Sequence, residues 1–217
     1  ENYRTARLKS ALPSAIVRTP EISPSITKNT LIVTHSSYIY DCGASIKPAL
    51  DDLVKQFKQL SLPVVYLMIS QDEMDDSTWF TEDRHPTFAI NAPSGIHQLK
   101  IDTSEITIAG GFFQQCQKNT VYLAIENYFS KSQQKPFTIH IPMSATYTRG
   151  DSPDEVFSLK EQLKAQGESK FLKNIEEEYA KPRLLFHPEL KIEIRLDGKV
   201  MSSLGTGQNL IVLDLTR

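Results

Sequence analysis

Apolar positions along the chain alternate between short continuous runs and longer amphipathic stretches. The first run covers residues 31–35 and ends in His35, and the second covers residues 64–69. Both are short and rich in β-branched residues, which is typical of strands buried on both faces of a sheet. Between them, apolar residues recur at three- and four-residue steps from Ile46 to Leu60, which is the period of an amphipathic helix. This part of the chain therefore predicts a strand–helix–strand unit.

The same order of elements returns further along the chain. A strand is predicted at residues 106–109, a Gly-Gly turn and a helix over residues 113–129 follow, and another strand covers residues 137–141. Alternating strands and helices favour a parallel sheet with helices on both faces. We therefore predict an α/β fold in which all four strands lie side by side. Residues 70–95 are acidic and then rich in Pro, Asn and Gly, which predicts a long loop.

The two ends of the chain show other patterns. Residues 1–29 hold several prolines and no clear period, and are expected to form an irregular arm. Residues 153–180 predict amphipathic helices that break near Gly167, and Asp197-Gly198 is a strong hairpin signal between two strand patterns. We therefore expect a small C-terminal addition of helices and antiparallel strands. The predicted organisation is an arm (1–29), an α/β core domain (30–150) and a C-terminal extension packed on the core (151–217).

Composition and charge narrow the classes of partner. The chain has 217 residues, a formal net charge of −2, and Lys and Arg residues that are scattered along it. Nucleic-acid surfaces need concentrated positive charge, and a bilayer span needs roughly 18 consecutive apolar residues, so neither partner is expected. Two cysteines are too few for a zinc site, and no metal or cofactor is predicted. A small-molecule ligand and a homo-oligomer stay open, and the sequence indicates no compartment.

Cys116 has the most distinctive chemical setting in the sequence. It follows the Gly110-Gly111 turn that ends a buried strand, and it lies at the opening of the predicted helix. Unpaired N–H groups and the positive dipole at a helix start favour a thiolate over a thiol. A nucleophilic cysteine needs such surroundings. The alternative is a small buried apolar residue, which is how many free cysteines behave.

The segment around this cysteine has a recognisable spacing. It reads ITIAGGFFQQCQKNT over residues 106–120: an apolar strand ends in Gly110, Cys116 lies six residues later, and Thr120 follows four residues beyond. This spacing resembles the cysteine segment of the isochorismatase-like cysteine hydrolases, and the order of elements over roughly residues 30–145 is also similar. The resemblance implies the α/β fold of that family. It also implies a hydrolase that acts on a small amide, imide or vinyl-ether substrate through a covalent adduct on Cys116.

Two functional positions of that family differ in this chain. His35 stands at the end of the first strand, where the family has its general-base Asp, and the family's Lys has no clear counterpart, Lys100 being the nearest lysine. A Cys–His pair can still act as nucleophile and base, because imidazole accepts a thiol proton near neutral pH. We therefore expect Cys116 and His35 to form the catalytic pair. The alternative for His35 is a hydrogen bond to local backbone at the strand end.

Residues next to Cys116 are the expected substrate contacts. Gly111, Phe112 and Phe113 precede the cysteine, and Trp79 lies in the predicted long loop, where it could line a pocket or act as a lid. Backbone N–H groups at the helix start would hold an oxyanion. Simple packing is the alternative for the aromatic side chains. No His-x-His or paired Glu-His spacing appears, so the sequence predicts no metal ligands.

Three function classes remain at this point. The first is the cysteine hydrolase, and the second is a catalytically degenerate member of the same fold that serves as a binding or interaction protein. The missing carboxylate and lysine favour the second class, because a thiol without its usual partners loses orders of magnitude in rate. A redox-responsive protein that uses Cys42 and Cys116 is the third. The sequence does not tell whether these two cysteines are bridged, since a disulfide needs Cα atoms within about 7 Å.

Overall fold

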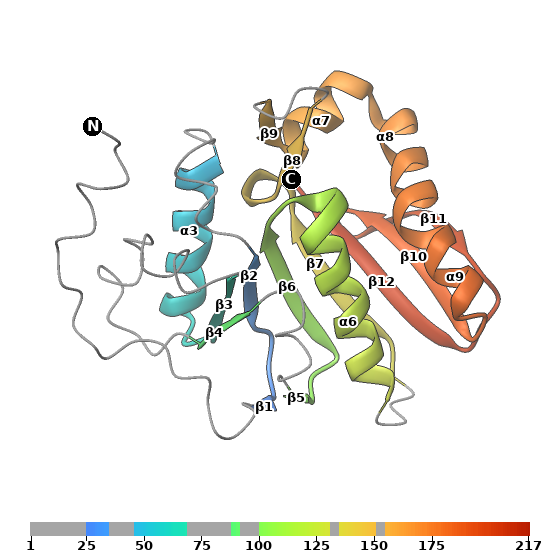
Figure 1. The fold of residues 1–217 in the computed structure, drawn as a ribbon, viewed down its shortest axis with the longest axis horizontal. Helices are drawn as coiled ribbons and strands as arrows, with labels where there is room; N and C mark the ends of the chain where they lie inside the picture. The colour runs from blue at the N-terminus through green and yellow to red at the C-terminus, as the bar shows by residue number, and fades with distance from the viewer. Residues whose placement is uncertain (1–24, 35–45, 69–87, 92–99, 131–134, 151–154) are drawn as a thin grey trace, which may run out of the picture.

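A central sheet of eight strands organises the protein, as the computed structural model shows (Figure 1). The structure describes residues 25–34, 46–68, 88–91, 100–130, 135–150 and 155–217. The strands of the central sheet are β2 (Leu31–Thr34), β3 (Val64–Met68), β4 (Phe88–Asn91), β6 (Glu105–Gly110), β7 (Phe137–Pro142), β10 (Leu190–Leu196), β11 (Lys199–Leu204) and β12 (Asn209–Thr216). Their order across the sheet is β11-β10-β12-β7-β6-β2-β3-β4, and only the β10–β11 pair is antiparallel.

Helices and two small sheets surround this central sheet. The helical elements are α3 (Ile46–Gln59), the π-helical turn η2 (Phe113–Gln117), α6 (Lys118–Phe129), the 3-10 turn η3 (Met143–Ala145), α7 (Leu159–Gln166), α8 (Glu168–Ile175), the π-helical turn η4 (Glu176–Ala180) and α9 (Lys181–Phe186). β1 (Ser25–Ile26) pairs in parallel with β5 (Lys100–Ile101), and β8 (Tyr147–Arg149) pairs antiparallel with β9 (Val156–Ser158). Among the described residues, no helix has both the length and the apolar character that a membrane crossing requires.

The four strands predicted from apolar runs lie side by side in one sheet. Their order is β7-β6-β2-β3, and each neighbouring pair is parallel. This arrangement confirms the predicted α/β fold with a parallel core. The register pairs Thr34 at the end of β2 with Gly110 at the end of β6, so the carboxyl ends of these two strands meet at the same edge of the sheet.

β4 extends the sheet within a stretch that the sequence predicts as loop. Residues 88–91 form a strand that pairs in parallel with β3. The strand has only four residues and lies between Pro86 and Pro93, so its apolar pattern is too short to stand out from its surroundings. The prediction of one loop over residues 70–95 is therefore wrong for these four residues. The rest of that stretch lies outside the described residues.

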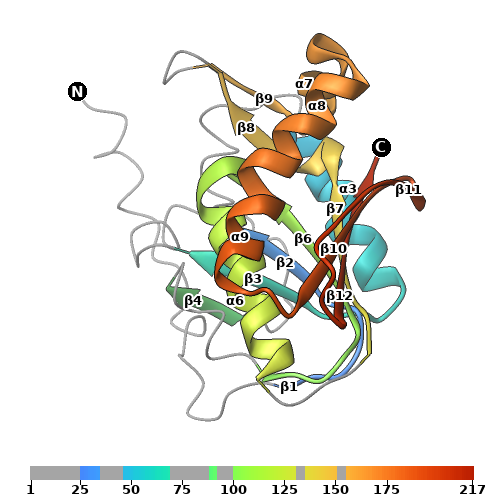
Figure 2. The same cartoon turned by 90° about the vertical axis from the view of Figure 1, so that its right-hand side faces the viewer.

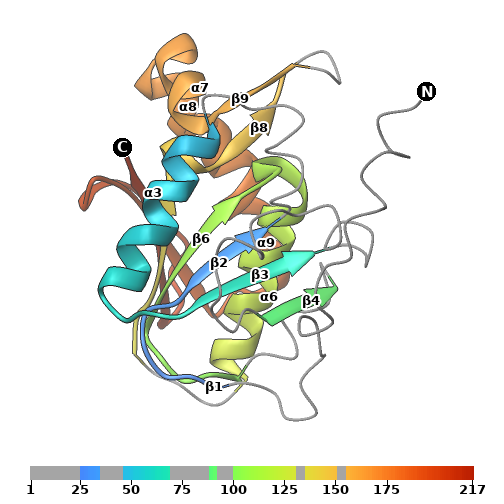
Figure 3. The ribbon, with the colours of Figure 1, turned by 90° about the vertical axis from the view of Figure 1, so that its left-hand side faces the viewer.

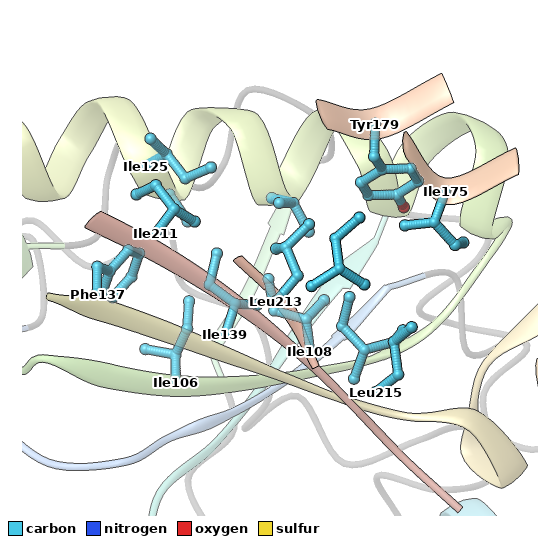
Figure 4. Packing of buried hydrophobic residues seen from close by; sticks show 14 of the residues in the cluster. Ile106, Ile108, Ile125, Phe137, Ile139, Ile175, Tyr179, Ile211, Leu213 and Leu215 are labelled. Atoms are coloured by element: carbon cyan, nitrogen blue, oxygen red, sulfur yellow. The ribbon is translucent and has the colours of Figure 1, made fainter. Parts of the chain in front are cut away.

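One face of the sheet packs against α6 and the helical stretch from α8 to α9. Alternate strand residues point to this face and form one large apolar cluster with the helices. Figure 4 shows Ile211 of β12 next to the α6 residue Ile125, and Tyr179 of η4 lies at the other end of the cluster. Each fully buried Ile or Leu contributes about 1.5–3 kcal/mol relative to an exposed one. This layer is therefore the main apolar core.

The opposite face of the sheet is covered by α3 over part of its width. Ile46, Leu50, Val54 and Phe57 recur at helical spacing and are buried against β2, β3 and β6. Figure 3 shows α3 and α6 on opposite sides of these strands. The α3 cluster includes no residue of β7, β10, β11 or β12. On the α3 side the apolar cluster stops at β6, so the predicted helical cover of both faces of the whole sheet stays a prediction.

The C-terminal region continues the main sheet instead of forming a separate antiparallel unit. The hairpin of β10 and β11 is antiparallel, as predicted, and turns at Asp197-Gly198 with positive φ at both residues. β12, however, inserts between β10 and β7 and is parallel to both. Residues 211–215 of β12 are all buried, which fits an interior strand of a sheet. The expectation of an antiparallel addition is therefore wrong for β12.

Candidate active site

The predicted nucleophile lies at the carboxyl edge of the sheet, in the turn that joins β6 to α6. The backbone of this turn is tied to the end of β2, because the N–H of Gly111 donates to the carbonyl of Thr34 at 3.0 Å. Gly110 adopts φ +90°, and a Cβ at this position would lie 2.0 Å from the same Thr34 oxygen. A glycine is therefore required at position 110 on two counts, its backbone conformation and its close approach to β2.

Cys116 is the fourth residue of the π-helical turn η2. Its thiol is free and the residue is half-buried. The hydroxyl of Thr120 donates to the Cys116 carbonyl at 2.9 Å, which fixes the junction between η2 and α6. The N–H groups of Gln115 and Gln117 both donate to the carbonyl of Phe112, so these two amides are already paired within the turn.

Three of the expected substrate contacts are packed into the protein. Phe112 is buried, with its ring edge-to-face on Tyr147 at 4.9 Å between centroids and the guanidinium of Arg149 above it at 4.3 Å. Phe113 is buried and stacks on Tyr179 at 4.5 Å. A side chain at position 111 would collide with the Tyr147 ring. Gly111, Phe112 and Phe113 therefore hold the turn in place. That each of them also contacts a substrate stays a prediction.

The turn is anchored from the C-terminal helical region. The phenol of Tyr179, in η4, donates a hydrogen bond to the carbonyl of Phe113. Burial raises the pKa of Tyr179 well above its ordinary value, and the charges of Tyr122 and Glu178 raise it further. The phenol therefore stays neutral and keeps its donor proton at physiological pH. Sequence reasoning did not identify this residue, because nothing local relates position 179 to position 113.

Two glutamines flank the cysteine and point into the protein. Gln117 is fully buried, and its amide nitrogen donates to the Ile108 carbonyl at 3.1 Å and to the Thr146 hydroxyl at 3.4 Å. The amide nitrogen of Gln114 donates to the hydroxyl of Thr148. The side-chain oxygens of both glutamines are buried and have no hydrogen-bond partner among the described residues. These buried amides were not predicted, because the Gln-Gln-Cys-Gln run does not tell which glutamines are buried.

The other predicted site residues follow strands whose ends are described. His35 comes directly after Thr34, whose carbonyl accepts the Gly111 N–H at the start of the cysteine turn. His35, Cys42 and Trp79 themselves lie outside the described residues. The Cys116–His35 pair and a substrate cleft beside it therefore stay predictions. Within the described ranges, no group of three or more His, Cys, Asp or Glu side chains is placed to hold a metal ion.

A second polar cluster lies away from this edge, on the face of the sheet that carries α3. The ring nitrogen Nδ1 of His140, in β7, lies 3.1 Å from Oδ2 of Asp214 in β12. The other ring nitrogen, Nε2, lies 3.4 Å from Oε2 of Glu105 in β6. The second oxygen of Asp214 accepts the N–H of Gly198 at 3.0 Å. This cluster joins three strands and a hairpin turn, which gives it a structural role.

Comparison of the chain with protein-family models, with curated proteins and with solved structures finds no match in any of the three. The geometry of the cysteine turn and the neighbouring end of β2 therefore carries the functional argument.

Proposed function

We propose that the protein is a cysteine hydrolase of the isochorismatase-like kind, which acts on a small amide, imide or vinyl-ether substrate through Cys116. One observation carries the proposal: a free, half-buried thiol lies in a strand-to-helix turn at the carboxyl edge of a parallel sheet. Open α/β sheets place their ligands at this edge. The turn is hydrogen-bonded to the end of β2, and His35 follows that strand directly.

The proposed chemistry uses the thiol and the imidazole as a pair. For an amide or imide substrate, His35 accepts the thiol proton, and the Cys116 sulfur attacks the substrate carbonyl carbon to form a tetrahedral adduct. The adduct collapses to a thioester, and the leaving nitrogen takes the proton from the imidazolium. Water then attacks the thioester with His35 as the base, which releases a carboxylic acid and restores the thiol. Nucleophile and base thus return to their starting states.

The described residues support this chemistry by holding the turn rigid. Gly110 allows the turn to lie against β2, Gly111 leaves room for the Tyr147 ring, and the Tyr179 phenol fixes the Phe113 carbonyl. An oxyanion would be stabilised by backbone N–H groups of the turn other than those of Gln115 and Gln117, which are already paired. Rigid placement matters, since donors aimed at the developing charge are worth about 10²–10³ in rate each.

Covalent trapping tests the proposal directly. The wild-type protein is incubated with a panel of simple amides, cyclic imides and vinyl ethers, and release of product is measured together with intact mass. Expected results are turnover of at least one class and, with an amide or imide, an acyl adduct on a peptide that contains Cys116. Cys116→Ser abolishes both, whereas Cys42→Ser leaves both in place and serves as the matched control. Adduct formation on Cys42 alone, or turnover that survives Cys116→Ser, contradicts the proposal.

His35 is tested by the rate at which iodoacetamide alkylates Cys116 at pH 7. The thiolate is the reacting form, so a paired cysteine reacts faster than a free one of ordinary pKa, about 8.5. Peptide mapping follows Cys116 and Cys42 separately in the same sample. We expect Cys116 to react about tenfold faster than a free-cysteine peptide, and His35→Ala to remove that difference. Equal rates of Cys116 alkylation in wild type and His35→Ala would show that His35 does not activate the thiol and has a structural role.

A second candidate function is a binding protein of the same fold that does not turn over a substrate. The observation that favours it is the burial of Phe112 and Phe113, which commits two expected substrate contacts to packing. The absence of the family's strand-end carboxylate adds to it. The same substrate panel separates the two candidates: a ligand that raises the melting temperature of wild type and Cys116→Ser equally, with no product and no adduct, supports binding alone.

A further inference from the structure

The strand β8 lies beside the turn that carries Cys116. Thr146, the residue before β8, forms a parallel bridge with Gly110 at the end of β6. The ring of Tyr147 then occupies the space that a side chain at position 111 would need. Figures 1 and 2 both show β8 next to the turn from which α6 begins. β8 therefore belongs to the carboxyl edge of the sheet, where the candidate active site lies.

The next two residues of β8 reach the same turn with their side chains. The hydroxyl of Thr148 accepts a hydrogen bond from the side-chain amide of Gln114. The guanidinium carbon of Arg149 lies 4.3 Å above the centroid of the Phe112 ring. Thr148 and Phe112 are buried, whereas Arg149 is exposed. The cation is therefore held above the turn, and its N–H groups remain accessible to a ligand.

Phe112 and Cys116 share one side of this turn. Phe112 directly precedes η2, and its carbonyl accepts the N–H groups of Gln115 and Gln117, so it forms part of the first helical turn. Cys116 follows Phe112 by four residues, which is close to one turn of a helix. Side chains at this spacing are neighbours, with about 5–6 Å between their Cβ atoms. Arg149 therefore places a positive charge on the side of the turn that carries the thiol.

The charge of Arg149 has no ion-pair partner within the described ranges. Glu155, across the β8–β9 pair, has its carboxylate against the next residue, Gly150. Lys118, the first residue of α6, adds a second cation two residues after Cys116. A guanidinium stacked on an aromatic ring keeps its planar fork of N–H groups available, and this fork matches the two oxygens of a carboxylate. The single charge of one guanidinium also matches the single charge of a carboxylate.

We infer that Arg149 selects a substrate that carries a carboxylate near the bond to be cleaved, an inference that rests on the proposed function. The carboxylate accepts two N–H groups of the guanidinium, while the carbonyl carbon of the amide or imide lies at the Cys116 sulfur. Two points of attachment fix the orientation of the reacting carbonyl, which a neutral substrate of the same shape lacks. The substrate class narrows from small amides and imides to their anionic members.

Two alkylating reagents of nearly the same shape test the charge beside Cys116 without any substrate. Iodoacetate is anionic and iodoacetamide is neutral, so the ratio of their rates at Cys116, divided by the same ratio for a free-cysteine peptide, reports the local charge. At pH 7 and low salt this relative ratio is expected to be about threefold above 1, the effect of one unit charge several ångströms away. Arg149→Gln is expected to lower it about threefold. In wild type, 1 M salt should do the same, because the Debye length is then about 3 Å.

Lys55→Gln is the matched control, because it removes the same charge from an exposed position on α3, toward the amino ends of the strands. It should leave the ratio unchanged. Arg149→Lys keeps the charge and loses the fork, so it should also retain the ratio. A wild-type ratio equal to that of the peptide, or equal ratios in wild type and Arg149→Gln, overturns the inference. A Cys116 that neither reagent alkylates in the folded protein overturns it as well.

Turnover separates this inference from the proposed function. Succinamate and succinamide have nearly the same shape and differ by one negative charge. Arg149→Gln and Arg149→Lys are both expected to lower kcat/KM for succinamate about tenfold relative to that for succinamide, because both lose the bidentate contact. An equal effect on the two substrates overturns the inference and leaves the hydrolase in place. A retained reagent ratio with no turnover of any amide or imide supports the anion site and contradicts the hydrolase.

Discussion

The phenol of Tyr179 donates a hydrogen bond to the main-chain carbonyl of Phe113, 66 residues earlier in the chain. The rings of the same two residues stack at 4.5 Å between centroids. The C-terminal helical stretch therefore holds the turn that carries Cys116, although the two segments are remote in sequence. This pair connects η4 directly to the turn that carries Cys116.

Tyr179→Phe keeps the ring stack and removes only the hydrogen bond. The buried carbonyl of Phe113 then loses a donor, which costs about 1–3 kcal/mol in the free energy of unfolding. Urea denaturation measures the loss. Tyr122→Phe is the control, because its hydroxyl also donates to a main-chain carbonyl, that of Tyr179 at 2.7 Å, but from a less buried position. An equal or larger loss in Tyr122→Phe would show that the Tyr179–Phe113 bond has no special weight.

Gly110→Ala is expected to be among the most damaging single substitutions in the described residues. A Cβ there would lie 2.0 Å from the carbonyl oxygen of Thr34, and the backbone has φ +90°. Gly167→Ala separates the two effects, since Gly167 also has positive φ (+77°) but nothing lies within 4 Å of its Cβ position. We expect about 1–3 kcal/mol for Gly167→Ala from the backbone alone, because φ +77° and ψ 156° suit only glycine, and a clearly larger loss for Gly110→Ala from the added collision.

Thermal and urea unfolding of both variants provide the comparison. If Gly110→Ala lowers the free energy of unfolding no more than Gly167→Ala does, the cysteine turn does not approach β2 as closely as described. The same result would remove the reason for placing His35 next to that turn.

Alkaline pH is expected to weaken the fold through Tyr122 and Tyr179. Burial raises the pKa of Tyr122 to about 12, although the charge of Arg183 opposes the shift, and burial also raises the pKa of Tyr179. When the pKa of a group is higher in the folded state than in the unfolded state, its whole contribution to stability is present at any pH below the unfolded-state pKa, which is 10.0 for tyrosine. That stability is lost as the pH rises toward the folded value. The free energy of unfolding should therefore fall between pH 10 and pH 12.

Tyr122→Phe removes one of the tyrosines whose pKa is raised by burial, and Tyr128 and Tyr179 remain. The slope of the unfolding free energy against pH should then become shallower by at most about 1.4 kcal/mol per pH unit. Partial exposure of Tyr122 reduces the difference. Urea titrations at intervals from pH 9 to pH 11.5 measure it, and identical slopes in wild type and Tyr122→Phe would contradict the assignment.

The parallel core could be predicted from sequence because each of its strands carries its own signal. Continuous apolar runs mark β2, β3, β6 and β7, and four short β-branched runs separated by helices have few other arrangements. β12 has the same kind of apolar run, but its position between β7 and β10 depends on which other strands of the sheet it pairs with. A pattern along one segment does not contain that information, and this is why β12 was expected in an antiparallel addition.

The start of α7 shows a signal that was present and misinterpreted. Residues 153–180 were expected to be helical, but Val156 and Phe157 belong to β9. The helix begins after Ser158, whose hydroxyl accepts the N–H of Glu161 while the Glu161 carboxylate accepts the N–H of Ser158. A Ser followed three residues later by Glu marks a helix start. Applied at this point, that rule separates the strand from the helix.

At the candidate site, sequence reasoning found the cysteine but not its supports. Cys116 was identified by the strand–turn–helix order around it, which is a local feature. Tyr179 and Thr148 come from distant segments that reach the turn only through the fold. Phe112 and Phe113 were expected to contact the substrate. An aromatic side chain next to a nucleophile can bind substrate or pack in the core, and the sequence alone does not distinguish the two roles.

Asp214 is expected to hold the C-terminal hairpin to the main sheet. Its side chain is 13% exposed and accepts the Gly198 N–H at the β10–β11 turn, while its other oxygen lies 3.1 Å from His140 of β7. Asp214→Ala leaves a turn amide and a ring nitrogen without their partner, and we expect a loss of about 1–3 kcal/mol. Glu105→Gln is the matched control: Glu105 lies on the other side of His140, at 3.4 Å, with a half-exposed side chain. An exposed contact of this kind contributes less than about 1 kcal/mol. Hydrogen exchange at the Gly198 amide distinguishes a local from a global effect. It should accelerate in Asp214→Ala more than in Glu105→Gln, and equal rates would show that the hairpin is held by its strand pairing alone.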